Sequence, residues 1–228
     1  MNPNTKFPVP YHTYHLADTP ELQAQLFTEL AQQKSFCFDI ETTGLDRFTS
    51  KLLGIAFSWK AHEGWYLPYS DSLLPALKSA LTSPAEKIGH NLKFDLSILL
   101  HHGIEVAGPF FDTLLADTLV SPERRHSMDY LSEILLGYTP VKLADISKPA
   151  AEPAPPASDD LFAHAEKTKA SKDLDISAIP LAVLAEYAAE DADVTWRLHR
   201  VLKARLADEG ATRIYERVDR PLVPVVAQ

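Results

Sequence analysis

The stretch "SFCFDIETTGLD", residues 35–46, puts two carboxylates where a core β-strand would carry apolar side chains. Because side chains alternate between the two faces of a strand, the segment has one apolar face and one face that ends in two acids. The apolar face carries Phe36, Phe38 and Ile40, and the other face carries Cys37, Asp39 and Glu41. An edge strand with a solvated acidic face would show the same pattern, so the role of the acids depends on the rest of the chain.

The composition is that of a soluble globular protein. The chain has 228 residues and is 46% hydrophobic, which suffices for one sizeable domain or two small ones. No apolar run approaches the length of a membrane span, and the N-terminal residues lack the basic and apolar segments of a secretory signal. Cys37 is the only cysteine, which excludes an internal disulfide and a cysteine-based metal cluster and favours a cytoplasmic location.

The charge of the chain limits how it could bind nucleic acid. A formal net charge of −9 argues against a large basic surface that grips phosphates directly. It leaves open a small acidic site that binds metal ions first and a phosphate through them.

The order of apolar and turn segments predicts an α/β protein. After the first strand, residues 51–59 and 63–69 form a predicted hairpin, so three adjacent antiparallel strands are expected. Further elements are a strand at 86–90 and helices at 71–83, 91–103, 112–120, 127–136 and from Pro180 to about Glu209. The Pro/Ala-rich stretch and the polar residues after it, at about 147–172, are expected to form a mobile excursion.

Two further carboxylates interrupt apolar helix faces. Asp191 falls within the apolar stripe of the last helix, which consists of Leu184, Ala188, Thr195, Leu198, Leu202 and Leu206. Tyr187 lies one turn before Asp191 on the flank of this stripe. Asp95 lies on the edge of the stripe formed by Leu92, Leu96 and Leu99. Structural explanations exist for each acid, because Asp95 could cap a helix or pair with a lysine, and Asp191 could pair with Arg197 or Arg200.

Four acids from three separate segments are harder to explain one by one. Hard divalent cations prefer carboxylate oxygens, and a buried group of like charges is stable mainly when cations neutralise it. Asp39, Glu41, Asp95 and Asp191 together therefore predict a two-metal site.

Three segments resemble the exonuclease motifs of the DEDD superfamily, in the branch whose third motif is Tyr-x-x-x-Asp. They are "FDIETTGLD", "GHNLKFD" and "YAAEDADVT", and the resemblance extends to "RHSMDYLSE" and "PLVPV". The family most similar to this set is the 3′→5′ proofreading domain of bacterial DNA polymerase I. The resemblance implies an α/β RNase H-like fold, with a central mixed sheet whose first three strands are antiparallel and which is flanked by helices.

The resemblance also implies roles for individual residues. Asp39, Glu41 and Asp191 would ligate one metal ion, Asp39 would also contact a second, and Asp95 would hold that second ion through water. Tyr187 would orient the attacking water. The cofactors would be two divalent ions, Mg²⁺ with Mn²⁺ or Zn²⁺ as alternatives. The residues expected to hold the single-stranded 3′ end are Leu45, Asn91, Arg125 and Met128, although Leu45 and Met128 also fit plain core packing.

Two features affect the expected organisation. The family often has an aromatic residue where Leu143 stands, so the grip on the last bases is expected to be looser. Residues 1–228 are expected to form a single exonuclease domain, and the stub at about 220–228 resembles the lead-in to a polymerase domain in a longer chain. The chain is therefore expected to be either a domain of a longer polymerase, which the acidic charge favours, or a free-standing exonuclease.

The sequence thus predicts a metal-dependent 3′→5′ exodeoxyribonuclease that acts on single-stranded or frayed DNA ends and has no membrane partner. An RNase D-like exoribonuclease shares all three motifs and is the second enzyme hypothesis. A catalytically inactive exonuclease fold, kept as a structural or DNA-binding module, is the third, because a fold does not fix an activity.

Overall fold

The fold is built around one mixed β-sheet. The computed structural model describes residues 11–44, 46–147 and 176–227. Their sheet has six strands in the order β1-β4-β3-β2-β5-β6. The strands are β1 (Thr13–Leu16), β2 (Ser35–Thr42), β3 (Leu52–Lys60), β4 (Glu63–Pro68), β5 (Glu86–Gly89) and β6 (Phe110–Asp112). Strands β2, β3 and β4 are antiparallel neighbours, whereas β1, β5 and β6 each pair in parallel with their neighbour.

The predicted α/β class and the three adjacent antiparallel strands are therefore confirmed, but these strands are not the first three in the chain. Strand β1 precedes them in the chain, so the antiparallel set is the second to the fourth strand rather than the first three. Strands β1 and β6 have only four and three residues. A strand this short shows too little alternation to be predicted from its sequence.

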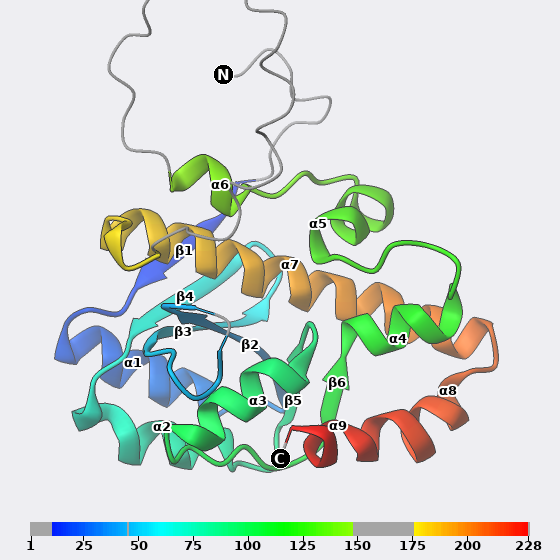
Figure 1. The fold of residues 1–228 in the computed structure, drawn as a ribbon, viewed down its shortest axis with the longest axis horizontal. Helices are drawn as coiled ribbons and strands as arrows, with labels where there is room; N and C mark the ends of the chain where they lie inside the picture. The colour runs from blue at the N-terminus through cyan, green and yellow to red at the C-terminus, as the bar shows by residue number, and fades with distance from the viewer. Residues whose placement is uncertain (1–10, 45, 148–175, 228) are drawn as a thin grey trace, which may run out of the picture.

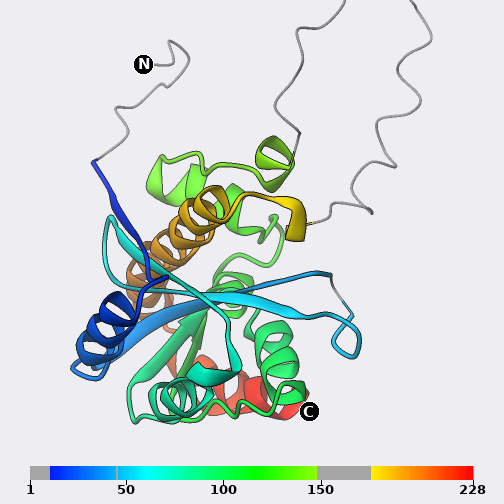
Figure 2. The same ribbon diagram turned by 90° about the vertical axis from the view of Figure 1, so that its left-hand side faces the viewer.

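Helices cover both faces of the sheet (Figures 1 and 2). One face packs against α1 (Pro20–Leu30), α2 (Leu74–Leu81), α3 (Leu92–His101) and α9 (Arg220–Val226). The opposite face packs against α4 (Thr113–Val120), α5 (Met128–Leu131), α6 (Leu143–Ile146) and α7 (Leu181–Asp208). Short elements complete the chain: 3-10 turns Asp71–Leu73 and Ile176–Ala178, π-turns Ser132–Leu136 and Tyr215–Asp219, and α8 (Thr212–Ile214).

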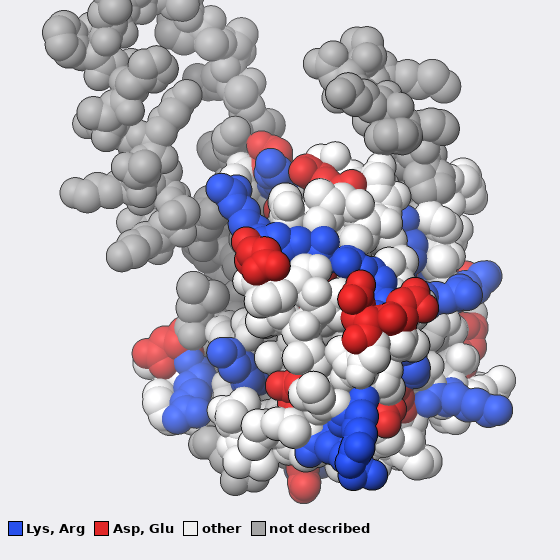
Figure 3. All heavy atoms as spheres, turned by 90° about the vertical axis from the view of Figure 1, so that its right-hand side faces the viewer, with Lys and Arg blue, Asp and Glu red and all other residues white. Residues whose placement is uncertain are grey.

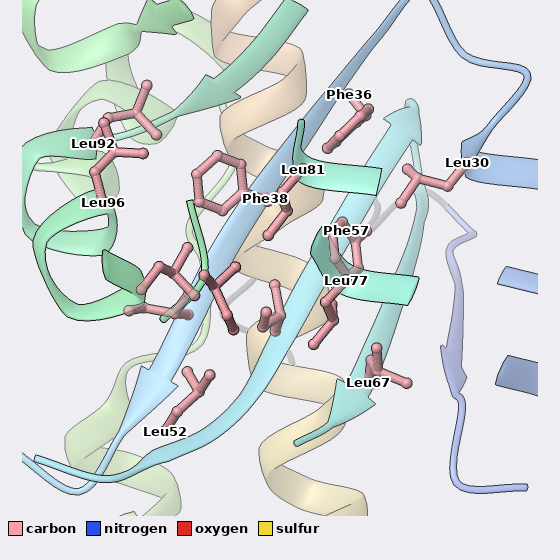
Figure 4. Packing of buried hydrophobic residues seen from close by; sticks show 14 of the residues in the cluster. Leu30, Phe36, Phe38, Leu52, Phe57, Leu67, Leu77, Leu81, Leu92 and Leu96 are labelled. Atoms are coloured by element: carbon pink, nitrogen blue, oxygen red, sulfur yellow. The ribbon is translucent and has the colours of Figure 1, made fainter. Parts of the chain in front are cut away.

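The alternation predicted for the first quoted stretch places β2 between two cores. Phe36, Phe38 and Ile40 belong to the core under α1, α2 and α3, and Figure 4 shows Phe36 and Phe38 among the leucines of those helices. Cys37 belongs to the core under α7. Because β2 pairs with β3 on one side and β5 on the other, the interpretation as a solvated edge strand is wrong.

Helix α7 crosses the sheet and contacts strands β1 to β5. It lies close to the sheet because small residues line the contact. A Cβ at Gly64 on β4 would meet the backbone oxygen of Ala189 at 2.5 Å, and Ala188 and Ala192 are fully buried. This close approach sets the distance between α7 and the acids of β2.

Most predicted helix ends agree with the structure. Gly103 and Gly210 follow α3 and α7 with φ angles of 71° and 68°, as expected for residues that end a helix. The predicted helix over 127–136 is instead α5 followed by a π-turn. The expected excursion at 147–172 lies, after Ser147, outside the described residues. Among the described residues, none of the helices is both long and apolar enough to span a lipid bilayer.

Candidate active site

The end of β2 and the middle of α7 bring three carboxylates together. Asp39, Glu41 and Asp191 each offer an oxygen atom, and these oxygens all lie within 4.8 Å of one another. Glu41 and Asp191 are only 6% and 7% exposed, whereas Asp39 keeps partial contact with solvent. The three acids therefore form a pocket of ligand atoms with one accessible side.

In the part of the chain that the structure describes, no cationic side chain pairs with Asp191 to explain its burial. Arg197, which sequence offered as one such partner, lies instead 3.5 Å from Asp193. Arg200, the other, is exposed on α7. Among the described residues, Oδ1 of Asp191 has no hydrogen-bond partner. A buried carboxylate oxygen without a partner is costly, so the geometry favours a ligand at this position.

Asp95 lies beside the three acids but outside their tight group. It occupies the first turn of α3, is 4% exposed, and accepts a hydrogen bond from the backbone of Ile40 on β2. The capping role that sequence allowed for Asp95 is held by Asp112. The carboxylate of Asp112 accepts hydrogen bonds from the backbone N–H groups of Asn91 and Leu92, at 3.0 and 2.8 Å.

The electrostatics of the acids follow from their burial and proximity. Burial raises the pKa of Asp39 to about 7. Burial, and then the charge of Asp39, raise the pKa values of Glu41, Asp95 and Asp191 well above their usual range. Four such carboxyl groups cannot all ionise near neutral pH unless positive charge joins them. Oxygen ligands without any soft donor suit a hard divalent cation such as Mg²⁺ or Mn²⁺.

Tyr187 joins the site from α7. It lies one turn before Asp191, and a hydrogen bond links its hydroxyl to the Asp191 carboxylate. Burial, and then the charges of Asp191 and Glu41, raise the pKa of Tyr187 far above its usual range. The phenol therefore stays protonated and acts as a hydrogen-bond donor.

The four residues predicted to hold a nucleic acid end lie in different settings. Asn91 begins α3 with a φ of 65°, a left-handed conformation that is uncommon outside glycine. Arg125 is exposed, whereas its neighbour Arg124 is bound to the buried Asp117, which also contacts His126. The side chain of Arg125 is thus accessible at the surface, whereas that of Arg124 is held by an ion pair.

Met128 and Leu143 both pack beside α7 at the edge of the second core. Met128 is half-buried, and its sulfur accepts a hydrogen bond of 3.3 Å from the hydroxyl of Thr195. Leu143 on α6 is also half-buried. A half-buried Met128 can both pack in the second core and contact a ligand. Leu45 lies outside the described residues.

Sequence reasoning missed two residues next to the site, Asp112 and Tyr66. Asp112 is the last residue of β6 and caps both α3 and α4, because its Oδ1 also accepts from the N–H of Leu114 at 2.9 Å. Tyr66 on β4 has a buried hydroxyl that lacks a partner among the described residues. An aspartate at the start of a helix is a recognisable sign of a capping residue, so the cap on α4 could have been predicted. The sequence does not show that Asp112 also caps α3, or in which direction the ring of Tyr66 points.

Known exonucleases and DNA polymerases are similar to this chain in sequence. Residues 14–207 match the family model of 3′-5′ exonucleases. DNA polymerase I of Rhizobium leguminosarum is 40% identical over 164 residues, which are 71% of this chain and 14% of that protein. DNA polymerase I of Pseudomonas aeruginosa is 31% identical over 88% of this chain and 22% of that protein. The chain spans about a fifth of the length of its first curated relatives.

Solved structures show the same fold. Brucella melitensis NrnC has a TM-score of 0.69 and 23% identity, over 95% of this chain and 92% of that one. Escherichia coli RNase D has a TM-score of 0.67 and 16% identity, over 95% of this chain and 51% of that one. The family match spans the three motifs, and the two relatives named above, at 31% and 40% identity, are bacterial DNA polymerase I proteins. The chain therefore belongs to the 3′-5′ exonuclease family, in the type found in DNA polymerase I.

Proposed function

We propose that this chain is a metal-dependent 3′→5′ exodeoxyribonuclease that releases nucleoside monophosphates from single-stranded or frayed DNA ends. The observation that carries the proposal is the group of three carboxylates whose oxygens lie within 4.8 Å of one another, together with an Asp191 oxygen that has no hydrogen-bond partner among residues 11–44, 46–147 and 176–227. Such a group suits divalent ions and, through them, a phosphate. Family membership supplies the reaction class.

The residues divide into ligands and a positioning donor. Asp39, Glu41 and Asp191 would hold one metal ion, and Asp95, next to Asp39, would hold a second one. When bound, the two ions supply a water of lowered pKa and a stabilising charge on the leaving 3′ oxygen. The hydroxyl of Tyr187 donates its hydrogen bond to the Asp191 carboxylate, and its oxygen would accept one from the attacking water and so orient that water. Because its proton is held far above neutral pH, Tyr187 is not the general base.

The strand end would be held by residues around the mouth of the site. Asn91, Arg125 and Met128 come from the start of α3, the loop before α5 and the start of α5, and Leu45 is proposed to contact the terminal bases. Apolar contacts to base faces tolerate any sequence, which suits an enzyme that removes whichever nucleotide is terminal. On the face drawn in Figure 3, basic side chains alternate with acidic and uncharged ones rather than forming one basic surface.

RNA is the main alternative substrate. Escherichia coli RNase D is an exoribonuclease involved in structured RNA processing, and Brucella melitensis NrnC has also been solved bound to pGG. Both are under 25% identical to this chain, whereas the relatives at 30% identity or above are DNA polymerases. This difference in sequence identity favours DNA over RNA as the substrate. An inactive module is disfavoured because all four acids are present.

We also propose that the chain works beside a polymerase domain in a longer cytoplasmic protein. The relatives with which it aligns are about four times its length, since 88–89% of this chain matches 21–22% of theirs. The C-terminal segment after α7 exposes apolar side chains that a neighbouring domain could cover. They are Ile214, Val218, Leu222, Val225 and Val226.

Asp39→Ala tests the proposed function. The substrates are 5′-labelled single-stranded DNA, paired duplex, 3′-mismatched duplex and single-stranded RNA, each with Mg²⁺ or Mn²⁺. We expect a 3′→5′ ladder on DNA that is fastest on frayed ends, and a loss of at least about 10³-fold in the variant, which lacks a ligand shared by both ions. Preference for RNA would favour the alternative substrate. Cleavage by the folded variant at a rate near that of the wild type would contradict the two-metal site.

A further inference from the structure

Tyr66 places a hydroxyl on the same face of the sheet as the candidate metal ligands. It pairs across β4 and β3 with Ala56, and Ala56 pairs across β3 and β2 with Asp39. Residues paired in this way point to the same face. Tyr66 accordingly packs in the core that contains Cys37 of β2 and Ala188 of α7.

The ring of Tyr66 lies over the residue that faces Glu41. Gly54 on β3 pairs with Glu41 on β2. A Cβ at Gly54 would collide with the hydroxyl and the end of the ring of Tyr66, so the hydroxyl occupies the space over that glycine. Burial, and then the charge of Glu41, raise the pKa of Tyr66 above its usual range. The phenol therefore keeps its proton beside the Glu41 carboxyl group.

The hydroxyl lacks the partner that a buried hydroxyl requires. Tyr66 is 0% exposed, and its oxygen has no hydrogen-bond partner among the described residues. Leaving a buried donor unpaired destabilises the folded state, so such groups are rare without a reason. The neighbouring Glu41 becomes an acceptor with several lone pairs once it is ionised, as it must be to ligate a cation.

We propose that Tyr66 is a positioning residue for Glu41. When Glu41 binds a metal ion, the Tyr66 hydroxyl donates a hydrogen bond to its carboxylate and fixes the oxygen that faces the ion. Partners of this kind around a metal ligand typically change metal affinity or activity by about 10- to 100-fold. The inference rests on the proposed metal-dependent function and adds a residue that touches neither ion nor substrate.

The test uses Tyr66→Phe, which removes only the hydroxyl, and measures Mn²⁺ binding without substrate by the electron paramagnetic resonance signal of free Mn²⁺. We expect the dissociation constant for Mn²⁺ to rise about tenfold. Without metal, the variant should unfold at the same temperature as the wild type or higher, because an unpaired polar group is removed. Tyr69→Phe is the matched control, since the Tyr69 hydroxyl donates to Asp71 on the surface at 3.0 Å.

A second comparison separates this role from general packing. In a Glu41→Leu background, Tyr66→Phe should change Mn²⁺ affinity by less than about twofold, because leucine has no oxygen to accept the hydrogen bond. Should the phenylalanine variant not fold, 3-fluorotyrosine at position 66 should give a ¹⁹F resonance that shifts with Mg²⁺ in the wild type and not in Glu41→Leu.

The outcomes distinguish the two proposals. Unchanged Mn²⁺ affinity in Tyr66→Phe, or an equal loss in the Glu41→Leu background, would overturn the role of Tyr66. The exonuclease proposal would then stand on DNA hydrolysis by the wild type. A wild-type protein that neither binds Mn²⁺ nor hydrolyses nucleic acid would overturn both.

Discussion

At the scale of single residues, the site consists of groups that are costly alone and compatible together. Asp191 has an unpartnered oxygen in a core, and Asp39 and Glu41 add like charge beside it. The sequence revealed these acids because each interrupts an apolar pattern. It could not reveal Tyr66, because an aromatic residue in a buried strand fits the pattern whether or not its hydroxyl has a function.

Tyr187 provides the first prediction at this scale. We expect Tyr187→Phe to slow hydrolysis by about 10- to 100-fold at saturating Mg²⁺, because a water that is held less precisely attacks less often. Mn²⁺ affinity should change little, since the carboxylates remain. Single-turnover rates on single-stranded DNA measure the effect. Tyr14→Phe is the control, because its hydroxyl donates at 3.1 Å to Asp193, two residues beyond Asp191 on the same helix. Equal rates for Tyr187→Phe and wild type would show that the hydroxyl is only structural.

At the scale of elements, long segments were predictable and short ones were not. Strand β2 and helix α7 contain enough residues for their periods to be recognised, and glycines mark the ends of α3 and α7. Strands β1 and β6 are too short, and their positions depend on pairing with β4 and β5. The start of α3, which carries Asp95, depends on the distant Asp112, and this dependence is a tertiary contact without a local signal.

Asp112 gives the prediction at this scale. Asp112→Ala should lower the free energy of unfolding by about 2–4 kcal/mol, because buried N–H groups at the starts of α3 and α4 lose their acceptor. Hydrolysis should also fall, since Asp95 sits in the first turn of α3. Urea unfolding followed by circular dichroism measures the stability. Asp18→Ala, which changes an exposed carboxylate, should leave it unchanged. A stable Asp112→Ala protein would show that these N–H groups find other partners.

At the scale of the whole molecule, the sheet and α7 assemble acids that are up to 152 positions apart, from Asp39 to Asp191. The motif order made this assembly predictable, but the depth of burial and the approach of α7 at Gly64 became visible only in the fold. Gathering these charges opposes folding at neutral pH in the absence of metal. Each carboxyl group has a folded-state pKa above its ordinary value, so the folded protein binds more protons than the unfolded chain.

Stability without metal should therefore fall as pH rises from about 4, the ordinary carboxyl pKa, through about 7, the folded-state pKa of Asp39. Divalent ions should reverse the loss, because ligands that bind only the folded state stabilise it, by about 2.7 kcal/mol at 100 times the dissociation constant. For a chain of this size that amounts to a rise of about 5–10 °C in Tm. Thermal unfolding at pH 5 and pH 8, with EDTA or Mn²⁺, measures both effects.

Asp39→Asn should raise the metal-free Tm at pH 8 and remove most of the Mn²⁺ response, whereas Asp46→Asn, at an exposed position after β2, should change neither. A Mn²⁺ response of equal size in Asp39→Asn would place the stabilising ion away from these acids.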